Sequence, residues 1–395
     1  MTNSTPPFDW MLACSSCGAT RTPDGLPTVC ACGQPWLVRY PDREWPTELR
    51  ERLQERRGLW RFREFLPITE SETPVTLGEG DTPLLFLRRT GERLGFGDLW
   101  MKDEAANPTG SFKARGLSAA ITRATYAGAS SFTLPTAGNA GVAAAAYCAR
   151  AGARVRVFAP RTTPPTILAQ IVTFGAELVL LEGHIGDCGL AARNFAAESK
   201  SFDLSTLREP YRIEGKKTLG LELALQFGWR LPDAVIYPTG GGTGLIGMWK
   251  AFHELVNAGW VEPGRFPRMY SVQSTGCAPV VRAFDTGAQD CEPWADPATR
   301  ASGLRVPNPL GGRLILAALG ESGGAAVAVD DDRLADLERS LAHEEGIDLS
   351  PEGAATVAAA IDLKRTGALG PNDRVLLFNT GAGWLYREPE QLPGP

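Results

Sequence analysis

The chain has 395 residues, 43% of them hydrophobic and 22% charged, which is typical of a globular protein with two or three domains. Its 45 acidic and 40 basic residues leave a net charge of −5, so nothing suggests nucleic acid or an anionic membrane as a partner. No apolar run reaches the roughly 18 residues of a membrane helix. Residues 1–10 lack the basic-then-apolar order of a secretory signal, so we expect a cytoplasmic protein.

Four of the eight cysteines lie near the start of the chain, in the segments CSSCG and CACG. The glycine behind each pair lets backbone amides turn toward the sulfurs, and four thiolates suit a tetrahedral Zn²⁺. The second pair has the spacing C-x-C instead of C-x-x-C, and a metal-free vestige is the alternative. We favour a closed structural zinc site, which makes residues 1–42 a zinc-ribbon-like unit. Its ligands would be Cys14, Cys17, Cys30 and Cys32.

Residues 43–65 are rich in arginine, glutamate and leucine and predict a helical connector. From residue 80 onward, short apolar runs alternate with helical patterns, which predicts α/β layers around mainly parallel sheets. The expected strands are 84–87, 99–102, 154–159, 177–181, 234–237, 269–273 and 374–379. The expected helices are 114–125, 140–151, 165–174, 190–200, 218–227, 331–345 and 352–365. Residues 285–312, rich in proline and glycine, predict a long loop of the functional or mobile kind.

Residues 107–116 read NPTGSFKARG and place Lys113 between a turn and a predicted helix. The chain has only seven lysines against 33 arginines, so a lysine at this position suggests a need for its amine. Lysine, unlike arginine, can lose its proton and attack a carbonyl to form a Schiff base. A solvated loop lysine is the alternative, because lysines between a turn and a helix are common.

Two further loops lie where a predicted strand ends and a helix begins, the position at which open α/β sheets bind ligands. Residues 135–141 read PTAGNAG; amides at a helix N-terminus can hold a carboxylate, and Asn139 can donate to a ring oxygen. Residues 237–245 read YPTGGGTGL, a nest of N–H groups suited to a phosphate. This loop has neither a P-loop ending nor a dinucleotide fingerprint. Together with Lys113, the loops describe a site for pyridoxal phosphate.

With these motifs, the chain resembles the fold-type II pyridoxal-phosphate enzymes, and within them the threonine synthases and their close relatives. The matching segments are 79–84, 107–116, 136–141, 212–218, 240–244 and 379–381. The resemblance implies an α/β fold of two open three-layer αβα domains, like the β subunit of tryptophan synthase, after the small cysteine-rich unit. Residues 43–120 and 208–395 would form a large cofactor domain and 121–207 a small domain. A homodimer is also implied.

The resemblance assigns a role to each matching residue. Lys113 would bind the cofactor as a Schiff base and later move protons, and Asn139 would contact the cofactor's 3-hydroxyl. Thr380 would hydrogen-bond the pyridine nitrogen; a neutral threonine does not keep that nitrogen protonated, which favours elimination and replacement over transamination. The cofactor phosphate would be held by Gly240, Gly241, Gly242, Thr243 and Gly244. The substrate carboxylate would be received by Thr136, Gly138 and Ala140, and a substrate phosphate or other anion by Ser111 and Arg212.

The implied reaction converts the amino acid O-phospho-L-homoserine and water to L-threonine and phosphate. Two departures from the family pattern are present: Ala114 stands where aspartate is usual, and residues 206–210 read TLREP in place of an Asn-Ser-x-Asn-Pro segment. Leu207 cannot donate a side-chain hydrogen bond to a phosphate. A related serine or threonine dehydratase, or a β-replacement enzyme similar to cysteate synthase, is therefore the alternative.

Nearby cations could rebuild the anion pocket; the candidates are Arg208, Lys216 and Lys217. A non-catalytic protein that binds pyridoxal phosphate, or a zinc-ribbon interaction protein, is a further alternative, against which the intact Lys113 argues. Arg305 and Asn308 lie in the long loop, and position alone gives no reason to place them in the site. Glu352 follows Ser350 and Pro351, and we interpret it as a first-turn acid of a helix; a residue that lines the cofactor pocket is the alternative.

Overall fold

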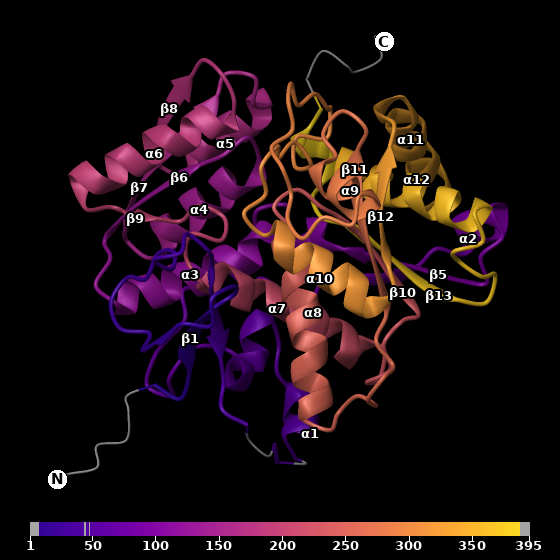
Figure 1. Cartoon of the computed structure of the whole chain (residues 1–395), viewed down its shortest axis with the longest axis horizontal. Helices are drawn as coiled ribbons and strands as arrows, with labels where there is room; N and C mark the ends of the chain where they lie inside the picture. Colours follow the sequence, from indigo (N-terminus) through magenta and orange to yellow (C-terminus); the bar gives the residue numbers. More distant parts are fainter. Residues whose placement is uncertain (1–7, 43–44, 47, 388–395) are drawn as a thin grey trace.

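The computed structural model describes residues 8–42, 45–46 and 48–387, and these residues form three sheets (Figure 1). The N-terminal sheet is antiparallel, in the order β2-β1-β3, with β1 at Met11–Cys14, β2 at Thr20–Arg21 and β3 at Trp36–Arg39. The predicted connector contains the helix α1 (Glu48–Glu55) and the 3₁₀ helix η1 (Leu59–Phe65). Residues 1–7 of the predicted N-terminal unit, residues 43, 44 and 47 of the predicted connector, and residues 388–395 lie outside the described residues.

The larger sheet has six strands in the order β12-β11-β10-β13-β5-β4. Their bounds are Leu84–Phe86 (β4), Asp98–Asp103 (β5), Ala234–Pro238 (β10), Arg268–Ser274 (β11), Ala325–Val329 (β12) and Arg374–Asn379 (β13). All neighbours are parallel except β4 and β5. Along β10, Val235 and Tyr237 enter one buried core while Ala234 and Ile236 enter another. Both faces are therefore covered, which explains the continuous apolar strands.

Helices cover both faces of this sheet. They are α2 (Arg88–Leu94), α7 (Tyr211–Gln226), α8 (Thr243–Asn257), α9 (Pro279–Asp285), α10 (Gly312–Ser322), α11 (Leu334–Glu345) and α12 (Pro351–Arg365). α12 packs on β10, β11 and β13, while α10 packs on β11 and α8. Three 3₁₀ helices complete this part: η2 (Glu104–Ala106), η3 (Asp331–Arg333) and η4 (Gly383–Leu385). No helix among the described residues is long and apolar enough to cross a bilayer.

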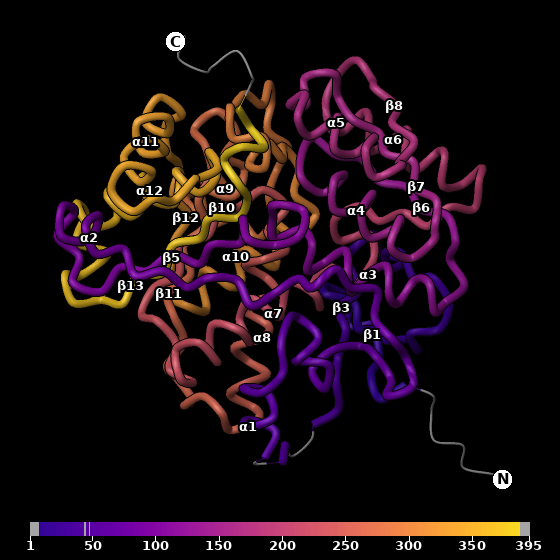
Figure 2. The backbone as a smooth tube through the Cα atoms, turned by 180° about the vertical axis from the view of Figure 1, so that it is seen from behind, coloured from indigo at the N-terminus to yellow at the C-terminus, as the bar shows by residue number. Residues whose placement is uncertain are grey.

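The smaller sheet is parallel, in the order β8-β7-β6-β9. Its strands are β6 (Ser131–Pro135), β7 (Arg154–Pro160), β8 (Glu177–Leu181) and β9 (Phe202–Asp203), and its helices are α3 (Lys113–Tyr126), α4 (Asn139–Arg150), α5 (Pro165–Thr173) and α6 (Ile185–Ser199). Helix α3 packs on both α4 and α7 and so joins the two parallel sheets. Figure 2 shows α4–α6 and the pair α11 and α12 on opposite sides of the molecule.

The register of the larger sheet brings three loops together. In β5 and β13, Asp103 lies opposite Asn379, and in β10 and β13, Ile236 lies opposite Leu377. These three parallel strands therefore end at one edge of the sheet. The segments that follow them carry Lys113, Thr380 and the glycines at 240–244, so the topology places the three motifs at a single edge.

Candidate active site

Lys113 is the first residue of α3, and the turn before it is closed by backbone hydrogen bonds. Gly110 adopts the left-handed conformation, with φ 66°, and its N–H donates to the carbonyl of Asn107 at 2.8 Å. The N–H of Phe112 then donates to the carbonyl of Thr380 at 3.0 Å. The structure thus brings two predicted site residues, Lys113 and Thr380, into adjacent segments although they lie far apart in the sequence.

The environment of Lys113 favours its neutral amine. Its side chain is partly buried, and its Nζ lies 3.9 Å from the ring centroid of Phe112. Burial lowers the pKa of Lys113 from 10.5 to about 7; the nearby Arg212 lowers it as well, and Glu352 opposes the change. With this pKa about half of the amine is neutral at pH 7, and the neutral form can attack a carbonyl, which is the chemistry expected of this residue.

A buried ion cluster anchors the first turn of α3. Arg115 donates to Glu104 at 2.7 Å and to Glu222 at 3.0 Å, and all three side chains are fully buried. Lys102 also pairs with Glu222, at 2.5 Å. Thr82, from the matching segment 79–84, donates its backbone N–H to Glu222 at 3.0 Å. The buried ion cluster and the segment 79–84 therefore hold α3, β5 and α7 together and fix the first turn of α3, which carries Lys113.

The glycine loop at 240–244 forms a cradle at the N-terminus of α8. A Cβ atom at Gly240 would lie 2.2 Å from the carbonyl oxygen of Gly303, and one at Gly244 would lie 1.9 Å from the hydroxyl of Tyr237. Neither position can take a side chain. The helix begins at Thr243, directly after Gly242 in the left-handed conformation. Free amides at a helix N-terminus suit a phosphate, so this loop fits the phosphate of the proposed cofactor.

The loop before α4 is organised by Thr136. Its hydroxyl accepts hydrogen bonds from the N–H groups of Gly138 at 3.1 Å and Gly141 at 3.0 Å. It also donates to the carbonyl of Gly138 at 2.6 Å. The hydroxyl is thus engaged within the loop, and the amides of Asn139 and Ala140 at the start of α4 are the groups that could bind a carboxylate.

Asn139 lies against the segment that follows β13. A Cβ atom at Gly381 would lie 2.8 Å from its Nδ2, which also donates to the hydroxyl of Tyr386 at 3.1 Å. The Oδ1 of Asn139 and the Oγ of Ser111 are buried and have no hydrogen-bond partner among the described residues. Buried polar atoms rarely stay unpaired in native structures, so these two atoms indicate a missing ligand.

Arg212 is almost fully buried near the start of α7. Its Nη1 donates to the carbonyl of Leu204 at 2.7 Å, and its Nε has no partner among the residues that the structure describes. Burial lowers the pKa of Arg212, while the nearby acids Glu209 and Asp203 raise it. The Nε of the guanidinium is therefore free to donate to a ligand, but the carboxylates of Glu209 and Asp203 already offset part of its positive charge.

The stretch 206–210 has one basic and one acidic residue, Arg208 and Glu209. Leu207 is buried with φ 63°, and burial raises the pKa of Glu209, whose carboxylate accepts the N–H of Arg212, to about 7. The expectation that Lys217 joins an anion pocket is wrong, because it pairs with Glu214 at 2.7 Å and Glu254 at 2.9 Å on another face of α7.

The other two cations considered for the anion pocket also have partners. Arg208 lies 3.5 Å from Asp203 in an ion pair. Lys216 remains near the site: its Nζ donates to the carbonyl of Phe112 and lies 4.0 Å from that ring's centroid. Of the three cations, only Lys216 is therefore oriented toward the lysine loop.

Three residues lie at the site although no motif of the sequence assigns them to it: Ser302, Glu352 and Tyr386. Glu352 is a first-turn acid of α12, as expected, but it is also 97% buried (3% exposed) and is the acid that acts on Lys113. Burial raises the pKa of Tyr386, and the neighbouring Glu352 raises it further. The proline- and glycine-rich composition of the long loop and the position of Tyr386 shortly after Thr380 were the available signals.

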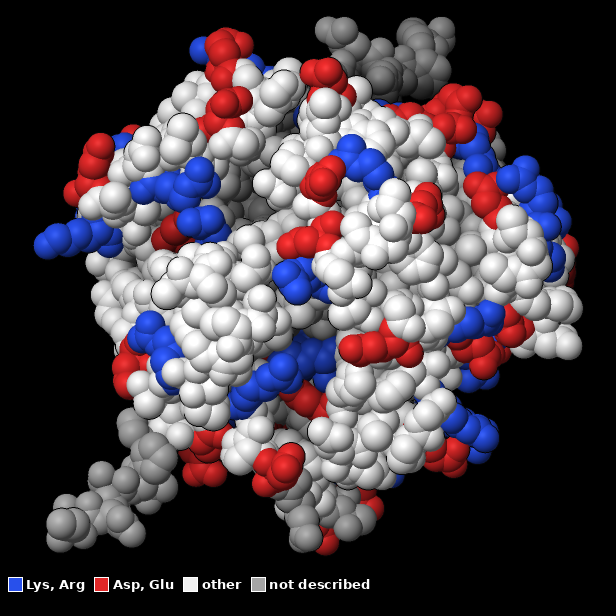
Figure 3. Space-filling view, in the orientation of Figure 1, with Lys and Arg blue, Asp and Glu red and all other residues white. Residues whose placement is uncertain are grey.

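The long loop lies beside the carboxylate loop, since a small cavity is lined by Ala137 from the carboxylate loop and by Pro297 and Arg305 from the long loop. Lys113 does not line this cavity. Figure 3 shows the surface hollowed between the part that carries the smaller sheet and the part that carries α9 and β12, with acidic and basic side chains interspersed around it.

The four N-terminal cysteines form a separate cluster. Their sulfur atoms all lie within 4.8 Å of one another, with 3.5 Å between Cys14 and Cys32 and 3.7 Å between Cys17 and Cys30. Tetrahedral zinc with Zn–S bonds of ~2.3 Å requires sulfurs ~3.8 Å apart, so this donor set fits the metal. Cys14 and Cys30 belong to the buried core that also contains residues of α3, and the unit meets α7 through Tyr40, which donates to Glu214 at 2.8 Å.

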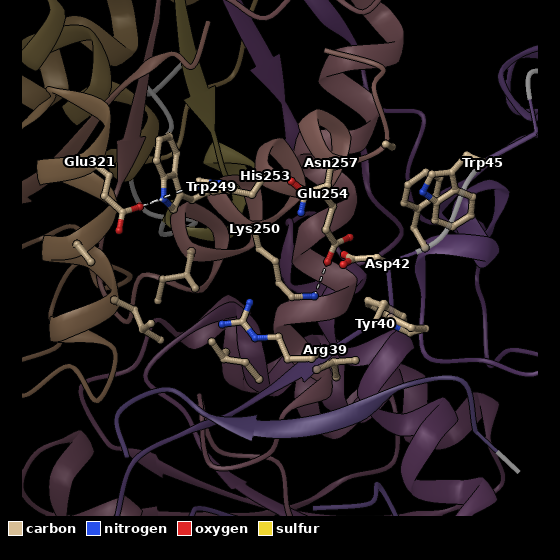
Figure 4. A pocket seen from close by; sticks show the side chains of 18 residues that line it. Arg39, Tyr40, Asp42, Trp45, Trp249, Lys250, His253, Glu254, Asn257 and Glu321 are labelled. Carbon is tan, nitrogen blue, oxygen red and sulfur yellow. Dashed lines mark hydrogen bonds and ion pairs between the residues drawn. The ribbon is translucent and has the colours of Figure 1, made fainter. Parts of the chain in front are cut away.

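A cavity of about 980 Å³ lies between the end of β3 and helices α8 and α10 (Figure 4). Lys250 and Glu254 line it and form an ion pair at 2.7 Å, and Trp249 donates to Glu321 at 2.8 Å. Arg39 also projects into it. None of the predicted cofactor or substrate residues lines this cavity, so it is not part of the Lys113 site.

Comparisons with known proteins agree with this geometry. The family model described as pyridoxal-phosphate dependent enzyme matches residues 75–381. A threonine synthase of Methanocaldococcus jannaschii is 34% identical over 94% of this chain and 91% of its own length. One of Methanosarcina acetivorans is 32% identical over 96% and 93%. Among solved structures, maize serine racemase shares the fold, with a TM-score of 0.67 and 21% identity over 76% of this chain and 88% of its own.

Proposed function

Since the chain belongs to the family of pyridoxal-phosphate-dependent enzymes, we propose that it is a threonine synthase. It converts O-phospho-L-homoserine and water to L-threonine and phosphate. One observation supports this proposal most strongly. Lys113, whose pKa is lowered to about 7, is brought together with the N-termini of α4 and α8, which are suited to anions. The relatives named threonine synthase, which match nearly the whole chain, support the choice of reaction.

In this proposal the cofactor, when bound, withdraws electrons from the α-carbon of the amino acid and so makes its proton removable. The glycine loop 240–244 would hold the cofactor phosphate, Asn139 and Thr380 would hold the ring at its hydroxyl and its nitrogen, and Lys113 would hold the aldehyde carbon. When its Nζ is free and neutral, Lys113 would take the α-proton and return protons at later carbons, which its lowered pKa favours.

The substrate is bound at its two ends. The amides of Asn139 and Ala140 at the start of α4 receive the carboxylate, while Thr136 and Gly138 bond to each other and fix the shape of the loop. Ser111, whose Oγ is free among the described residues, and the free Nε of Arg212 receive the phosphate. Release of the phosphate followed by addition of water at the β-carbon completes the reaction, and these anchors keep the substrate oriented throughout.

A dehydratase that acts on L-serine or L-threonine, or a β-replacement enzyme, is the second candidate. One observation favours it: Asp203 and Glu209 lie close enough to offset part of the charge of Arg212, and the buried Leu207 has no side-chain hydrogen-bond donor to offer a phosphate. The two candidates separate when the holoenzyme is given L-serine and O-phospho-L-homoserine in parallel. Phosphate and threonine from the second substrate support the synthase, whereas 2-oxo acid and ammonia from the first support the dehydratase.

We further propose a structural zinc ion on Cys14, Cys17, Cys30 and Cys32. The mutual distances of the four sulfurs support this assignment. The proposal includes three structural units, namely the zinc-ribbon-like unit at 1–42, the large domain at 43–120 and 208–395, and the small domain at 121–207. A cytoplasmic homodimer completes it; size-exclusion chromatography with light scattering tests the dimer, since a monomeric mass would contradict it.

A further inference from the structure

An unpaired acid lies in the wall of the site. The Oε1 of Glu352 accepts the N–H of Gly303 at 2.7 Å, while its Oε2 is buried and has no hydrogen-bond partner among the described residues. The Oγ of Ser302, in a side chain that is 8% exposed, is also buried without a partner there. Burying a polar atom without a partner costs free energy, and more for a charged group, so both oxygens are suited to a ligand that donates.

These atoms face the reaction centre and not a separate pocket. Glu352 is the acid whose charge acts on Lys113. A Cβ atom at Gly138, in the carboxylate loop, would lie 3.5 Å from the Oγ of Ser302. The hydroxyl of Tyr386 interacts with Glu352, with Ser302 and with Asn139. It has a single proton to donate, so lone pairs on Glu352 Oε2 and Ser302 Oγ stay open to a ligand. These two oxygens lie between the lysine, the carboxylate loop and the residue proposed to hold the ring hydroxyl.

The segment that presents Ser302 is held by the rest of the fold. Thr299 donates to Asp331 at 2.9 Å, and the N–H of Arg300 donates to the same carboxylate at 2.7 Å. The Arg300 guanidinium also pairs with Glu338 at 3.0 Å. Gly303 is fixed in turn by Glu352 itself. The wall is thus preorganised, which reduces the entropic cost of binding a ligand against it.

The roles proposed for the other residues leave this wall unassigned. Lys113, Asn139, Thr380 and the glycine loop account for the aldehyde, hydroxyl, nitrogen and phosphate of the cofactor. The amides before α4 account for the carboxylate of the substrate. What remains is the side chain of the amino acid. A carboxylate oxygen accepts hydrogen bonds and repels anions, so it selects a hydrogen-bond donor and not a phosphate.

We infer that Glu352, assisted by Ser302, is a specificity-determining residue that accepts a hydrogen bond from a hydroxyl group on the side chain of the bound amino acid. In the proposed reaction this is the hydroxyl that water supplies at the β-carbon, so the inference rests on the proposed function and deepens it. The subsite of Glu352 and Ser302, which binds a hydrogen-bond donor, is then distinct from the anion subsite of Ser111 and Arg212. The first recognises the hydroxyl of the product, and the second recognises the phosphate of the substrate.

The test is a rapid-mixing titration of the holoenzyme with L-threonine and with L-valine, in which a methyl group replaces the hydroxyl. The change in the cofactor's absorption reports binding before any turnover. We expect the wild type to bind L-threonine at least about tenfold more tightly than L-valine, as for a charge-assisted hydrogen bond. In Glu352→Gln the amide oxygen must serve the N–H of Gly303, so the ratio should fall to about threefold or less.

Ser302→Ala should lower the ratio less than Glu352→Gln does, and Glu177→Gln, an exposed acid on β8, should leave it unchanged. An unchanged ratio in Glu352→Gln, or equal affinities in the wild type, would overturn the inference. Either of these two results can be distinguished from a failure of the proposed reaction. Loss of selectivity with intact turnover of O-phospho-L-homoserine removes only the inference, whereas intact selectivity without turnover removes only the proposed reaction.

Discussion

The backbone N–H of Phe112 donates to the carbonyl of Thr380 at 3.0 Å. Together with the bond from the N–H of Ala382 to the carbonyl of Gly110 at 2.8 Å, it joins the loop that carries the reactive lysine to the loop that follows the central strand β13. It sets the distance between the group that would hold the cofactor's aldehyde and the group that would face its ring nitrogen. The relative positions of Lys113 and Thr380 therefore depend on backbone pairing and not on flexible side chains.

Replacement of Lys113 by alanine should give a folded protein without activity. The side chain is partly buried and makes no ion pair among the described residues, so its loss removes chemistry and little stability. We expect at least about a thousandfold loss of turnover and no covalent cofactor after borohydride reduction. Circular dichroism checks the fold, and Lys200→Asn at an exposed position is the matched control. Covalent cofactor in Lys113→Ala would contradict the assignment.

Capture of pyridoxal phosphate by the cofactor-free protein should depend on the pKa of Lys113. Because burial lowers that pKa to about 7, the neutral amine predominates above this pH. The rate should rise between roughly pH 6 and 8 and then level off, whereas an ordinary lysine would continue to gain up to about pH 10. Since Glu352 opposes the lowering, Glu352→Gln should move the midpoint to lower pH. Stopped-flow absorbance measures both curves.

Arg115→Met should destabilise the protein strongly. The substitution leaves Glu104 and Glu222 buried with only part of their compensating charge. Removing one partner from a buried ion network costs about 3–5 kcal/mol of the free energy of unfolding. Urea denaturation measures this loss. As a comparison, Arg88→Ala breaks an exposed pair with Glu92 and should cost less than about 1 kcal/mol. Equal costs would show that the cluster does not anchor α3.

The cysteine cluster should contain one zinc ion in each chain, with Cys14→Ser or Cys17→Ser losing it. Cys291→Ser, outside the cluster, should retain the metal. Because the cluster supplies none of the residues proposed to hold the cofactor, metal loss should expose the N-terminal unit to proteolysis while the cofactor's absorption persists. Plasma emission spectrometry and limited proteolysis provide the measurements. A wild-type protein purified without chelators and free of zinc would refute the assignment.

The sequence was sufficient for the elements whose patterns are local. Strands 177–181 and 374–379 have the predicted bounds, since each is a short apolar run closed by turn residues. Helix α7 begins seven residues before the predicted start at 218, because Gly215 weakens the helical pattern. That glycine is required by packing: a Cβ atom there would lie 2.0 Å from the carbonyl oxygen of Arg115 in α3.

The site could be predicted from the sequence only in part, because several of its residues are brought together by tertiary contacts that no local pattern indicates. The placement of Lys113 beside Thr380 follows from a parallel sheet whose strand order the sequence does not state. Glu352, Ser302 and Tyr386 carry no periodic or motif signal, and each enters the site through a tertiary contact. The strand β12 reads AAVAV, a pattern too short and too rich in alanine to be separated from helix.

The most direct test of the account is incubation of the purified holoenzyme with O-phospho-L-homoserine, with phosphate and L-threonine measured in the same sample. Lys113→Ala serves as the blank for spontaneous hydrolysis of the phosphate ester. We expect phosphate and threonine in a one-to-one ratio from the wild type and neither from the variant. Phosphate without threonine, or no product while the cofactor's absorption shows that it is bound, would contradict the proposed reaction.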